Sequence, residues 1–171
     1  MLDLEVKGLR ELDTLLAGLP DKLRANILRG ALNAAGKEIA EEARRLAPVQ
    51  TGTLRDSIRV STRLVRGTTN VEAKVKVGGK QKGKRSVFYA RFIEFGTAAH
   101  IIRGRNGPLK FNGTHTLEVA HPGVKKKPFM RPALDARLPS ALEAFRERLR
   151  KRMTKEGINL PEEFLPAEDD E

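Results

Sequence analysis

The apolar pattern at the start of the chain has the period of an α-helix. Between residues 6 and 19 leucines recur every three or four positions, which predicts a short amphipathic helix. Gly18 and Pro20 break this pattern, and Asp21 opens a second, longer one. That helix is expected to stop at Ala47, because the proline that follows disfavours helical backbone. Its apolar stripe is rich in alanine, so we expect a sheet or another helix to pack closely against it.

The middle of the chain changes to a period of two. Residues 58–65 and 71–77 alternate apolar with charged or polar side chains, as half-buried antiparallel strands do. Residues 66–70 are expected to form the turn between them. Residues 78–86 contain no apolar side chain, which predicts a basic loop that projects from the domain. The basic residues of this loop are Lys80, Lys82, Lys84 and Arg85.

A compact apolar segment over residues 87–95 follows the loop. Its nine residues are consistent with a short helix or a buried strand, and periodicity does not decide between the two. Glu94 is the one acidic residue of this segment, and burying an unpaired carboxylate is costly. We therefore expect Glu94 to be largely buried and paired with an arginine, either Arg55 or Arg59.

The last part of the chain returns to the helical period. It begins with a Gly- and Asn-rich excursion over residues 100–113 and a predicted third strand over residues 114–120. A long helix is expected from Pro132, which suits a first helical turn. Pro139 lies inside its pattern and should kink or restart the helix, and Gly157 should end it.

These patterns predict an α+β fold. A long N-terminal helix and a C-terminal helix would pack on one face of a mainly antiparallel β-sheet with extended basic loops. At 171 residues the chain has the length of one domain with a tail. We place the domain at residues 1–157 and an acidic arm at residues 158–171, where six acids follow Pro161. This arm is expected to become ordered only by docking on a neighbouring subunit or an adjoining ring.

The charge of the chain is concentrated in its middle. The net charge is +11, and residues 48–133 carry eighteen basic but only four acidic residues. Such a block indicates a polyanionic neighbour, either nucleic acid or an acidic protein surface, although a solvated sheet face remains an alternative. Aromatic residues make up only 5%, which argues against a base-stacking nucleic-acid module. No apolar run reaches the length of a membrane span, and residues 1–10 lack a signal-peptide core.

The sequence offers little catalytic chemistry. There is no cysteine, which excludes disulfides and thiolate metal sites. His100, His115 and His121 fall within 22 residues, but their spacing does not favour a metal site. A basic nuclease site that adds Asn112 with Glu94 or Glu118 is a weaker alternative. No phosphate-binding loop or nucleophile elbow is present. We therefore expect no catalytic, metal or cofactor residues and a binding or structural role.

Three segments resemble one family of tailed-bacteriophage proteins. Residues 47–58, APVQTGTLRDSI, resemble the signature of small neck or tail-completion proteins, related in role to the lambda-type minor tail protein Z. Residues 89–97, YARFIEFGT, and the HPG at 121–123 that leads to KPFMRPAL at 127–134 look like the same family, in the same order. The resemblance runs over residues 4–155. We interpret the motif residues as fold-determining: Pro48, Thr51, Gly52, Leu54, Tyr89, Glu94, Gly96, Thr97, Pro128, Phe129, Arg131 and Pro132.

The resemblance implies a non-enzymatic virion protein of the phage neck, assembled in the host cytoplasm. Such a protein would complete the tail and join it to the DNA-filled head as part of a homo-oligomeric ring around the DNA channel. Sixfold symmetry is favoured and twelvefold is the alternative, with head-closure and tail-terminator proteins as neighbours and genomic DNA nearby. Candidate contacts to DNA or partners are Lys80, Lys82, Lys84, Arg85, Lys125, Lys126 and Lys127. A basic nucleic-acid-binding accessory protein remains the alternative, with a metal-dependent nuclease less favoured.

Overall fold

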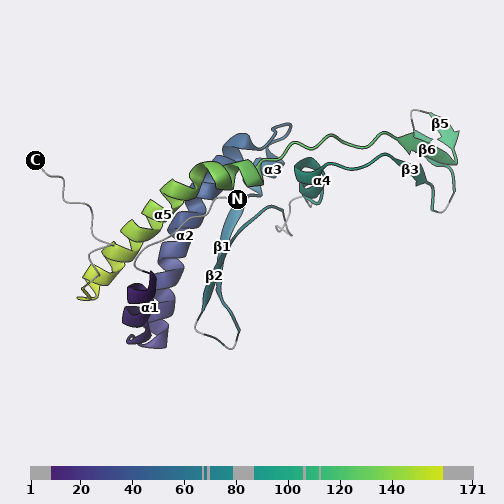
Figure 1. Cartoon of the computed structure of the whole chain (residues 1–171). Helices are drawn as coiled ribbons and strands as arrows, with labels where there is room; N and C mark the ends of the chain where they lie inside the picture. The colour runs from purple at the N-terminus through teal and green to yellow at the C-terminus, as the bar shows by residue number, and fades with distance from the viewer. Residues whose placement is uncertain are drawn as a thin grey trace, which may run out of the picture.

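A computed structural model of the chain shows a helical body from which a long β-arm extends (Figure 1). The structure describes residues 9–66, 68, 70–78, 87–105, 107–111 and 113–159. The basic residues 80–85 and the acidic residues 160–171 lie outside the described residues, so the expectations for them stay predictions. The same holds for the division of the chain at residue 157.

The two N-terminal helices agree with the sequence pattern. Helix α1 spans Leu9–Ala17 and helix α2 spans Asp21–Leu46, with Pro20 at the N-terminal boundary of α2. Ala47 has extended backbone angles, φ −62° and ψ 129°, as expected for a residue before proline. The leucine stripe of α1 packs against α2, where Ile27 and Ala31 are buried.

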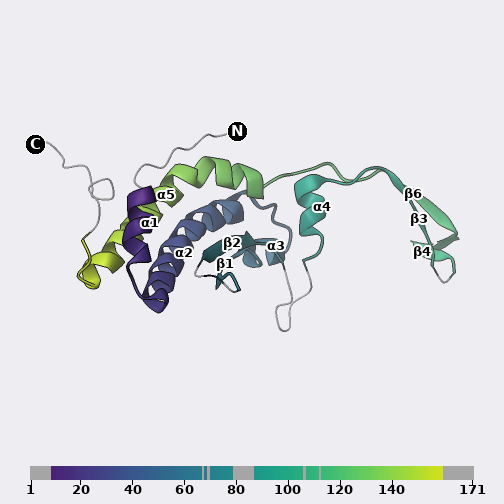
Figure 2. The same ribbon diagram turned by 60° about the horizontal axis from the view of Figure 1, so that its bottom comes forward.

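The long C-terminal helix α5, Met130–Lys155, packs along α2 as the largest contact of the body (Figure 2). Pro139 lies inside α5, which curves over α2 but continues without a restart. Gly157 ends the helix in a left-handed conformation with φ +70°. The N–H of Ile158 then donates to the carbonyl of Met153 at 3.0 Å, which closes the last turn.

A β-hairpin covers the other side of α2. Strands β1, Arg59–Leu64, and β2, Val71–Lys76, pair antiparallel with Val60 opposite Val75. Val60 faces α2 so closely that a Cβ on Gly36 would lie 2.7 Å from its Cγ1 atom. The small residues of α2 thus allow the close approach that the sequence indicated. The outer face is charged, and Glu72 lies 3.0 Å from Arg63.

Two short helices complete the body. Helix α3, Thr53–Asp56, follows the first motif turn, and helix α4, Ala90–Phe95, lies within the apolar segment over residues 87–95. The choice between a helix and a strand for residues 87–95 is therefore settled in favour of a helix. One face of this segment joins the core through Val87 and Ala90, while Phe88 and Phe95 are more than 70% exposed.

The arm contains more strands than the sequence predicted. Residues 100–113 hold β3, His100–Arg103, and β4, Leu109–Phe111. The single strand expected at 114–120 is divided into β5, Thr114–Thr116, and β6, Glu118–His121. Strand β3 pairs with β6 and β4 with β5, both antiparallel. The expectation of one strand after an irregular excursion is wrong, because the chain makes a ribbon of very short strands here.

The α+β class with antiparallel strands is confirmed. The described strands form three separate two-stranded pairs rather than one sheet. The helices and the hairpin are stacked in the order α5, α2, hairpin, so α2 is the layer that contacts both (Figure 2). None of the helices in the described part of the chain has the length and apolarity needed to cross a bilayer.

Candidate functional site

Two motif segments, residues 47–58 and 89–97, meet the 127–134 part of the third at one place in the body, and we call residues 47–58, 89–97 and 124–134 the motif junction. The HPG of the third segment, at 121–123, lies instead at the end of strand β6. The centre of the motif junction is Phe129, which is only 1% exposed. Residues from all three segments belong to one core cluster: Ala47, Leu54, Ile58, Ala90, Phe129 and Ala133. Segments far apart in the sequence are therefore held together where the arm leaves the body (Figure 1).

The first motif segment contains a tight turn, and the leucine that follows this turn is buried in the junction. Gly52 has φ +76°, a conformation that glycine adopts without steric cost, and it precedes α3. The hydroxyls of Thr51 and Thr53 lie 2.9 Å apart, and Leu54 is buried. A small hollow of about 160 Å³ lies between this turn and the second segment, lined by Pro48, Val49, Gln50, Thr51, Gly52, Leu54, Tyr89 and Ile93.

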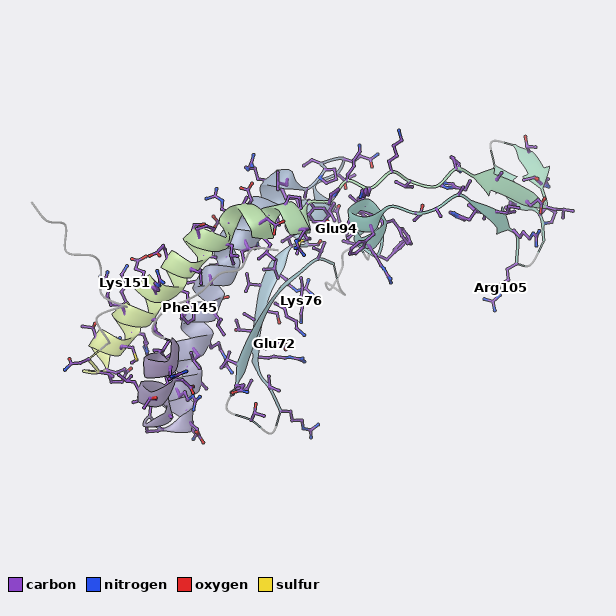
Figure 3. All side chains as sticks on the ribbon, in the orientation of Figure 1. Glu72, Lys76, Glu94, Arg105, Phe145 and Lys151 are labelled. Atoms are coloured by element: carbon purple, nitrogen blue, oxygen red, sulfur yellow. The ribbon has the colours of Figure 1, made fainter. Side chains whose placement is uncertain are left out.

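Glu94 joins the second segment to the third. Its Oε2 atom accepts hydrogen bonds from the backbone N–H groups of Phe129 at 2.8 Å and Met130 at 3.1 Å. Its Oε1 atom accepts from the N–H of Arg131 at 3.2 Å. These N–H groups open α5 and have no partner within the helix, and a carboxylate there also complements the helix dipole. Glu94 therefore caps α5 from outside that helix (Figure 3).

The expected arginine partner of Glu94 is wrong. Glu94 is only partly buried, and the described residues include no ion pair to it. Arg55 lies 3.7 Å from Asp56, whereas Arg59 donates to the carbonyl of Gly78. Backbone N–H groups supply the hydrogen bonds to the carboxylate. The prediction from the sequence considered only basic side chains as its partners.

The base of the arm is held by a short pairing between its two sides. The N–H of Thr97 donates to the carbonyl of Val124 at 3.0 Å, and the N–H of Val124 donates back at 3.2 Å. Gly96 has φ +73°, and a Cβ there would lie 2.7 Å from the Val124 oxygen. The N–H of Lys127 also donates to the carbonyl of Ile93 at 2.7 Å. Gly96 and Thr97 thus fix where the arm leaves the body.

The remaining motif residues lie around the start of α5. Pro128, Arg131 and Pro132 are exposed, in contrast to the buried Phe129 between them. The side chain of Arg131 contacts Asp135 at 3.3 Å. Pro132 occupies the first turn of α5, as its fixed φ favours.

The candidate basic contacts that the structure describes are all exposed. Lys125, Lys126 and Lys127 lie at the base of the arm. The rings of His100 and His121 lie side by side across β3 and β6, with centroids 5.0 Å apart, whereas His115 belongs to the β4–β5 pair. No cluster of three metal-ligating side chains occurs within the described ranges.

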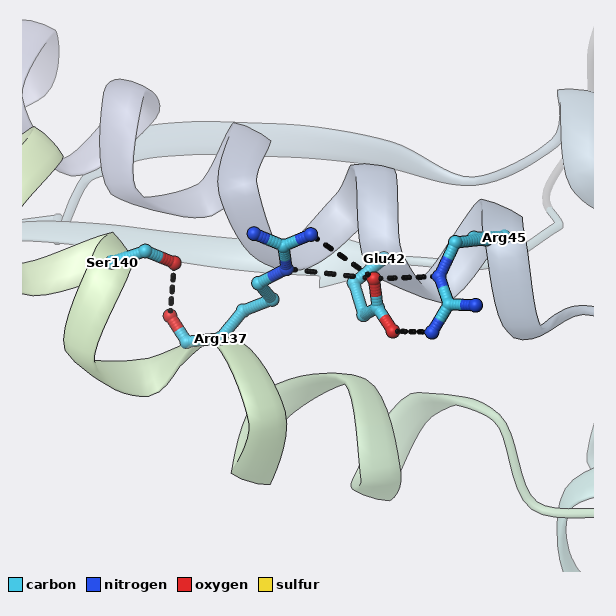
Figure 4. Close-up of polar contacts among 4 residues, drawn as sticks. All are labelled: Glu42, Arg45, Arg137 and Ser140. Atoms are coloured by element: carbon cyan, nitrogen blue, oxygen red, sulfur yellow. Dashed lines mark hydrogen bonds and ion pairs between the residues drawn. The ribbon is translucent and has the colours of Figure 1, made fainter.

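Sequence reasoning missed an ion cluster between α2 and α5. Glu42 is only 5% exposed, and its carboxylate accepts hydrogen bonds from Arg45 of the same helix and Arg137 of α5 (Figure 4). The Arg45 Nε–Oε2 distance is 3.0 Å and the Arg137 Nε–Oε2 distance is 3.4 Å. The hydrogen bond from Arg45 is the main cause that lowers the pKa of Glu42, and burial acts in the opposite direction. The i, i+3 spacing of Glu42 and Arg45 was the only signal in the sequence.

An open, mainly apolar groove of about 720 Å³ lies beside the motif junction. Its apolar wall comes from β2, α2 and the ends of α4 and α5: Ile39, Ala73, Val75, Val77, Phe95, Phe129, Met130 and Leu134. Arg91, Glu94 and Arg131 also line it, and the two arginines are exposed. Phe95 and Leu134 are 73% and 37% exposed, so this groove presents apolar side chains to its surroundings.

Comparison with known protein families identifies the chain. A family model described as "Bacteriophage HK97-gp10, putative tail-component" matches residues 10–96, just over half of the chain. The chain belongs to this family. The match covers helices α1 to α4 and the hairpin β1–β2. It therefore includes the first motif segment and nearly all of the second, but not the third. No curated protein and no solved structure matches the chain.

As a member of the HK97-gp10-like family, the protein is a structural component of a phage tail and belongs to the virion. The resemblance to tailed-phage proteins is thus confirmed at the level of a tail component. Within the matched region, Leu54 is buried and Glu94 accepts a hydrogen bond from the N–H of Phe129 just before α5; the fold-determining role of the motif residues stays a prediction.

Proposed function

We propose that this tail component acts at the neck of the virion. It completes the tail and joins it to the DNA-filled head as one subunit of a ring around the DNA channel. Its role is structural, without an enzymatic step, and it is similar in role to the lambda-type minor tail protein Z. Sixfold symmetry is favoured over twelvefold, and the neighbours are the head-closure and tail-terminator proteins.

The observation that carries this proposal is the arm. Both views show strands β3 to β6 extending well beyond the body (Figures 1 and 2). A two-stranded ribbon is at best marginally stable alone in water. The arm nevertheless exposes apolar side chains, with Ile101 56% and Leu117 74% exposed. Such a ribbon suits contact with another molecule, and an adjacent ring of the neck provides one.

The charge distribution supports a place beside DNA. The chain has a net charge of +11, and Lys125, Lys126 and Lys127 are exposed at the base of the arm. Arg105 lies at the far end of the arm (Figure 3). Exposed lysines and arginines attract phosphates without reading the sequence of the bases, which is what passage of a genome requires.

Electron microscopy of virions made without this protein tests the proposal. Full heads separate from finished tails are the expected result, and complementation with the intact gene should restore joined particles. Normally joined particles in the absence of the protein would contradict the neck assignment. Tails of abnormal length or missing tails would also contradict it, because they place the protein in tail assembly rather than in joining.

The same basic residues support a second candidate function, that of an accessory protein that binds nucleic acid. Binding of free duplex DNA by the purified chain, with a steep dependence on salt, favours that role. The Lys125→Ala, Lys126→Ala, Lys127→Ala triple variant should then lose most of its affinity. A metal-dependent plasmid-nicking assay tests the nuclease alternative. Neighbouring head-closure and tail-terminator genes favour the neck role.

A further inference from the structure

The apolar groove beside the motif junction is open to the surroundings of the body. Its walls are apolar side chains of β2, α2, α4 and α5, and three charged residues, Arg91, Glu94 and Arg131, also line it. The Glu94 carboxylate accepts hydrogen bonds from backbone N–H groups at the start of α5, and Arg131 lies 3.3 Å from Asp135, so Arg91 is the groove's main source of positive charge. The edge of β2 away from β1 has no strand partner among the described strands. An apolar groove beside an unpaired strand edge suits an extended segment with apolar anchors, and Arg91 favours an acidic one.

The chain contains a segment with these properties. Residues 160–171, LPEEFLPAEDDE, combine the apolar residues Leu160, Phe164 and Leu165 with six acidic residues and no basic one. We propose that this acidic segment of one copy docks in the groove of a second copy, with Phe164 and Leu165 against the apolar wall and the adjacent carboxylates near Arg91 and Arg131. The proposal deepens the proposed function, because it rests on copies of the chain associating.

The groove and Ile158, two residues before the acidic segment, lie at opposite ends of α5. At 1.5 Å per residue the helix places about 32 Å between Leu134 and Lys155. Ile158 is held at the far end by its hydrogen bond to Met153 and by packing against the α1–α2–α5 cluster. The seven residues from there to Leu165 span at most about 25 Å when fully extended. By this estimate Leu165 falls short of its own groove, so we expect the contact to be made with the groove of a neighbouring copy.

Cysteine cross-linking tests the contact directly, since the natural chain contains no cysteine. A full-length chain with Phe95→Cys is mixed with one carrying Leu165→Cys under mild oxidation. Phe95 lines the groove and is 73% exposed, so its replacement leaves the core intact. A disulfide requires the two Cα atoms within about 7 Å, so covalent heterodimers are expected only if the segment occupies the groove.

The matched control is Phe95→Cys mixed with Arg105→Cys, which places the second thiol at the far end of the arm. Linking at least tenfold more frequent with Leu165→Cys supports the proposal. Equal linking contradicts it, and preferential linking to Arg105→Cys identifies the arm as the occupant instead. A chain carrying both Phe95→Cys and Leu165→Cys should link between chains, and linkage within one chain would overturn the proposal.

Self-association of the purified full chain gives an independent measurement. In sedimentation experiments Leu165→Asp should weaken association at least tenfold. Ala167→Asp adds the same charge two residues away without removing an anchor and should change it little. A wild-type chain that is monomeric at all accessible concentrations, or equal effects of the two variants, would contradict the proposed docking. These outcomes concern contacts between copies alone, so they are separate from the virion test of neck function.

Discussion

Glu94 and Phe129 are joined by a hydrogen bond of 2.8 Å from the N–H of Phe129 to the carboxylate of Glu94. One residue belongs to α4 before the arm, and the other immediately precedes α5 after it. The same carboxylate accepts from Met130 and Arg131. The start of α5 is therefore fixed by a residue on the opposite side of the arm, so the arm is fastened at both of its ends.

Replacement of Glu94 should destabilise the body. Glu94→Ala leaves the first N–H groups of α5 without their acceptor, and we expect a loss of about 1–2 kcal/mol in the free energy of unfolding. Glu94→Gln keeps one acceptor oxygen and should lose less. Chemical denaturation measures both. Glu118→Ala removes an exposed ion pair with Arg103 and should stay within about 0.5 kcal/mol, so an equal loss there would contradict the capping role.

The lowered pKa of Glu42 should make stability dependent on pH in the acid range. The folded state holds this carboxylate ionised more strongly than the unfolded state does. Its contribution is therefore complete above the ordinary glutamate pKa of about 4.3 and is lost as the pH falls through the folded-state value. Thermal unfolding between pH 7 and pH 3 measures this loss.

Glu42→Gln should flatten that pH dependence, because the substituted side chain does not titrate. The control is Glu147→Gln: the pKa of Glu147 is also lowered, chiefly by its hydrogen bond with Lys151, but both side chains are exposed. Solvent screening makes that pair weak, so the control should keep the slope of the wild type. A Glu42→Gln variant with an unchanged slope would show that another group causes the pH dependence.

The substitution Gly36→Ala should destabilise the protein when residue 60 is valine and stabilise it when residue 60 is alanine. Gly36→Ala places a Cβ 2.7 Å from Cγ1 of Val60, and overpacking outweighs the gain in helix propensity, for a net loss of about 1 kcal/mol. In a Val60→Ala background the same change should stabilise α2 by about 1 kcal/mol. Gly30→Ala meets only Arg148 at 3.8 Å and should stabilise the wild type. A double-mutant cycle of unfolding free energies without coupling would contradict the close packing.

Gly96 should be far less tolerant of substitution than Gly113, although both have positive φ angles. A Cβ on Gly96 would meet the Val124 oxygen at 2.7 Å, whereas no atom of the described residues lies within 4 Å of one on Gly113. We expect Gly96→Ala to cost about 2–4 kcal/mol and Gly113→Ala only the conformational part, about 1–2 kcal/mol. Amide exchange should also become faster at Thr97 and Val124 in the first variant alone. Equal costs would show that the base of the arm does not depend on this contact.

The body could be predicted from the sequence because its signals are local. The leucine and alanine stripes fix α1 and α2, and the alternation around Val60 and Val75 fixes the hairpin. Gly157 ends α5 through the left-handed conformation that glycine allows. Each of these signals depends on one face of an element being buried, which leaves a periodic trace in the sequence.

The arm and the polar contacts left no such trace. Every residue of β3 is exposed, so this strand shows no alternation of buried and exposed positions, and the other strands of the arm have only three or four residues each. The partners of Glu94 are backbone groups, which any sequence provides, and Arg137 reaches Glu42 from 95 positions away. Contacts of this kind depend on the positions of α4 and α5 in the folded chain. The local pattern of apolar and polar residues does not determine these positions.

The pairing of Thr97 with Val124 makes the arm a removable unit of the architecture. Thr97 and Val124 are paired with each other, so the chain enters and leaves the arm at the same place on the body. A short turn in place of residues 98–123 would keep the capped start of α5 and leave the core cluster around Phe129 intact. Evolution can therefore lengthen, shorten or exchange this ribbon to match a different partner while the same body is retained.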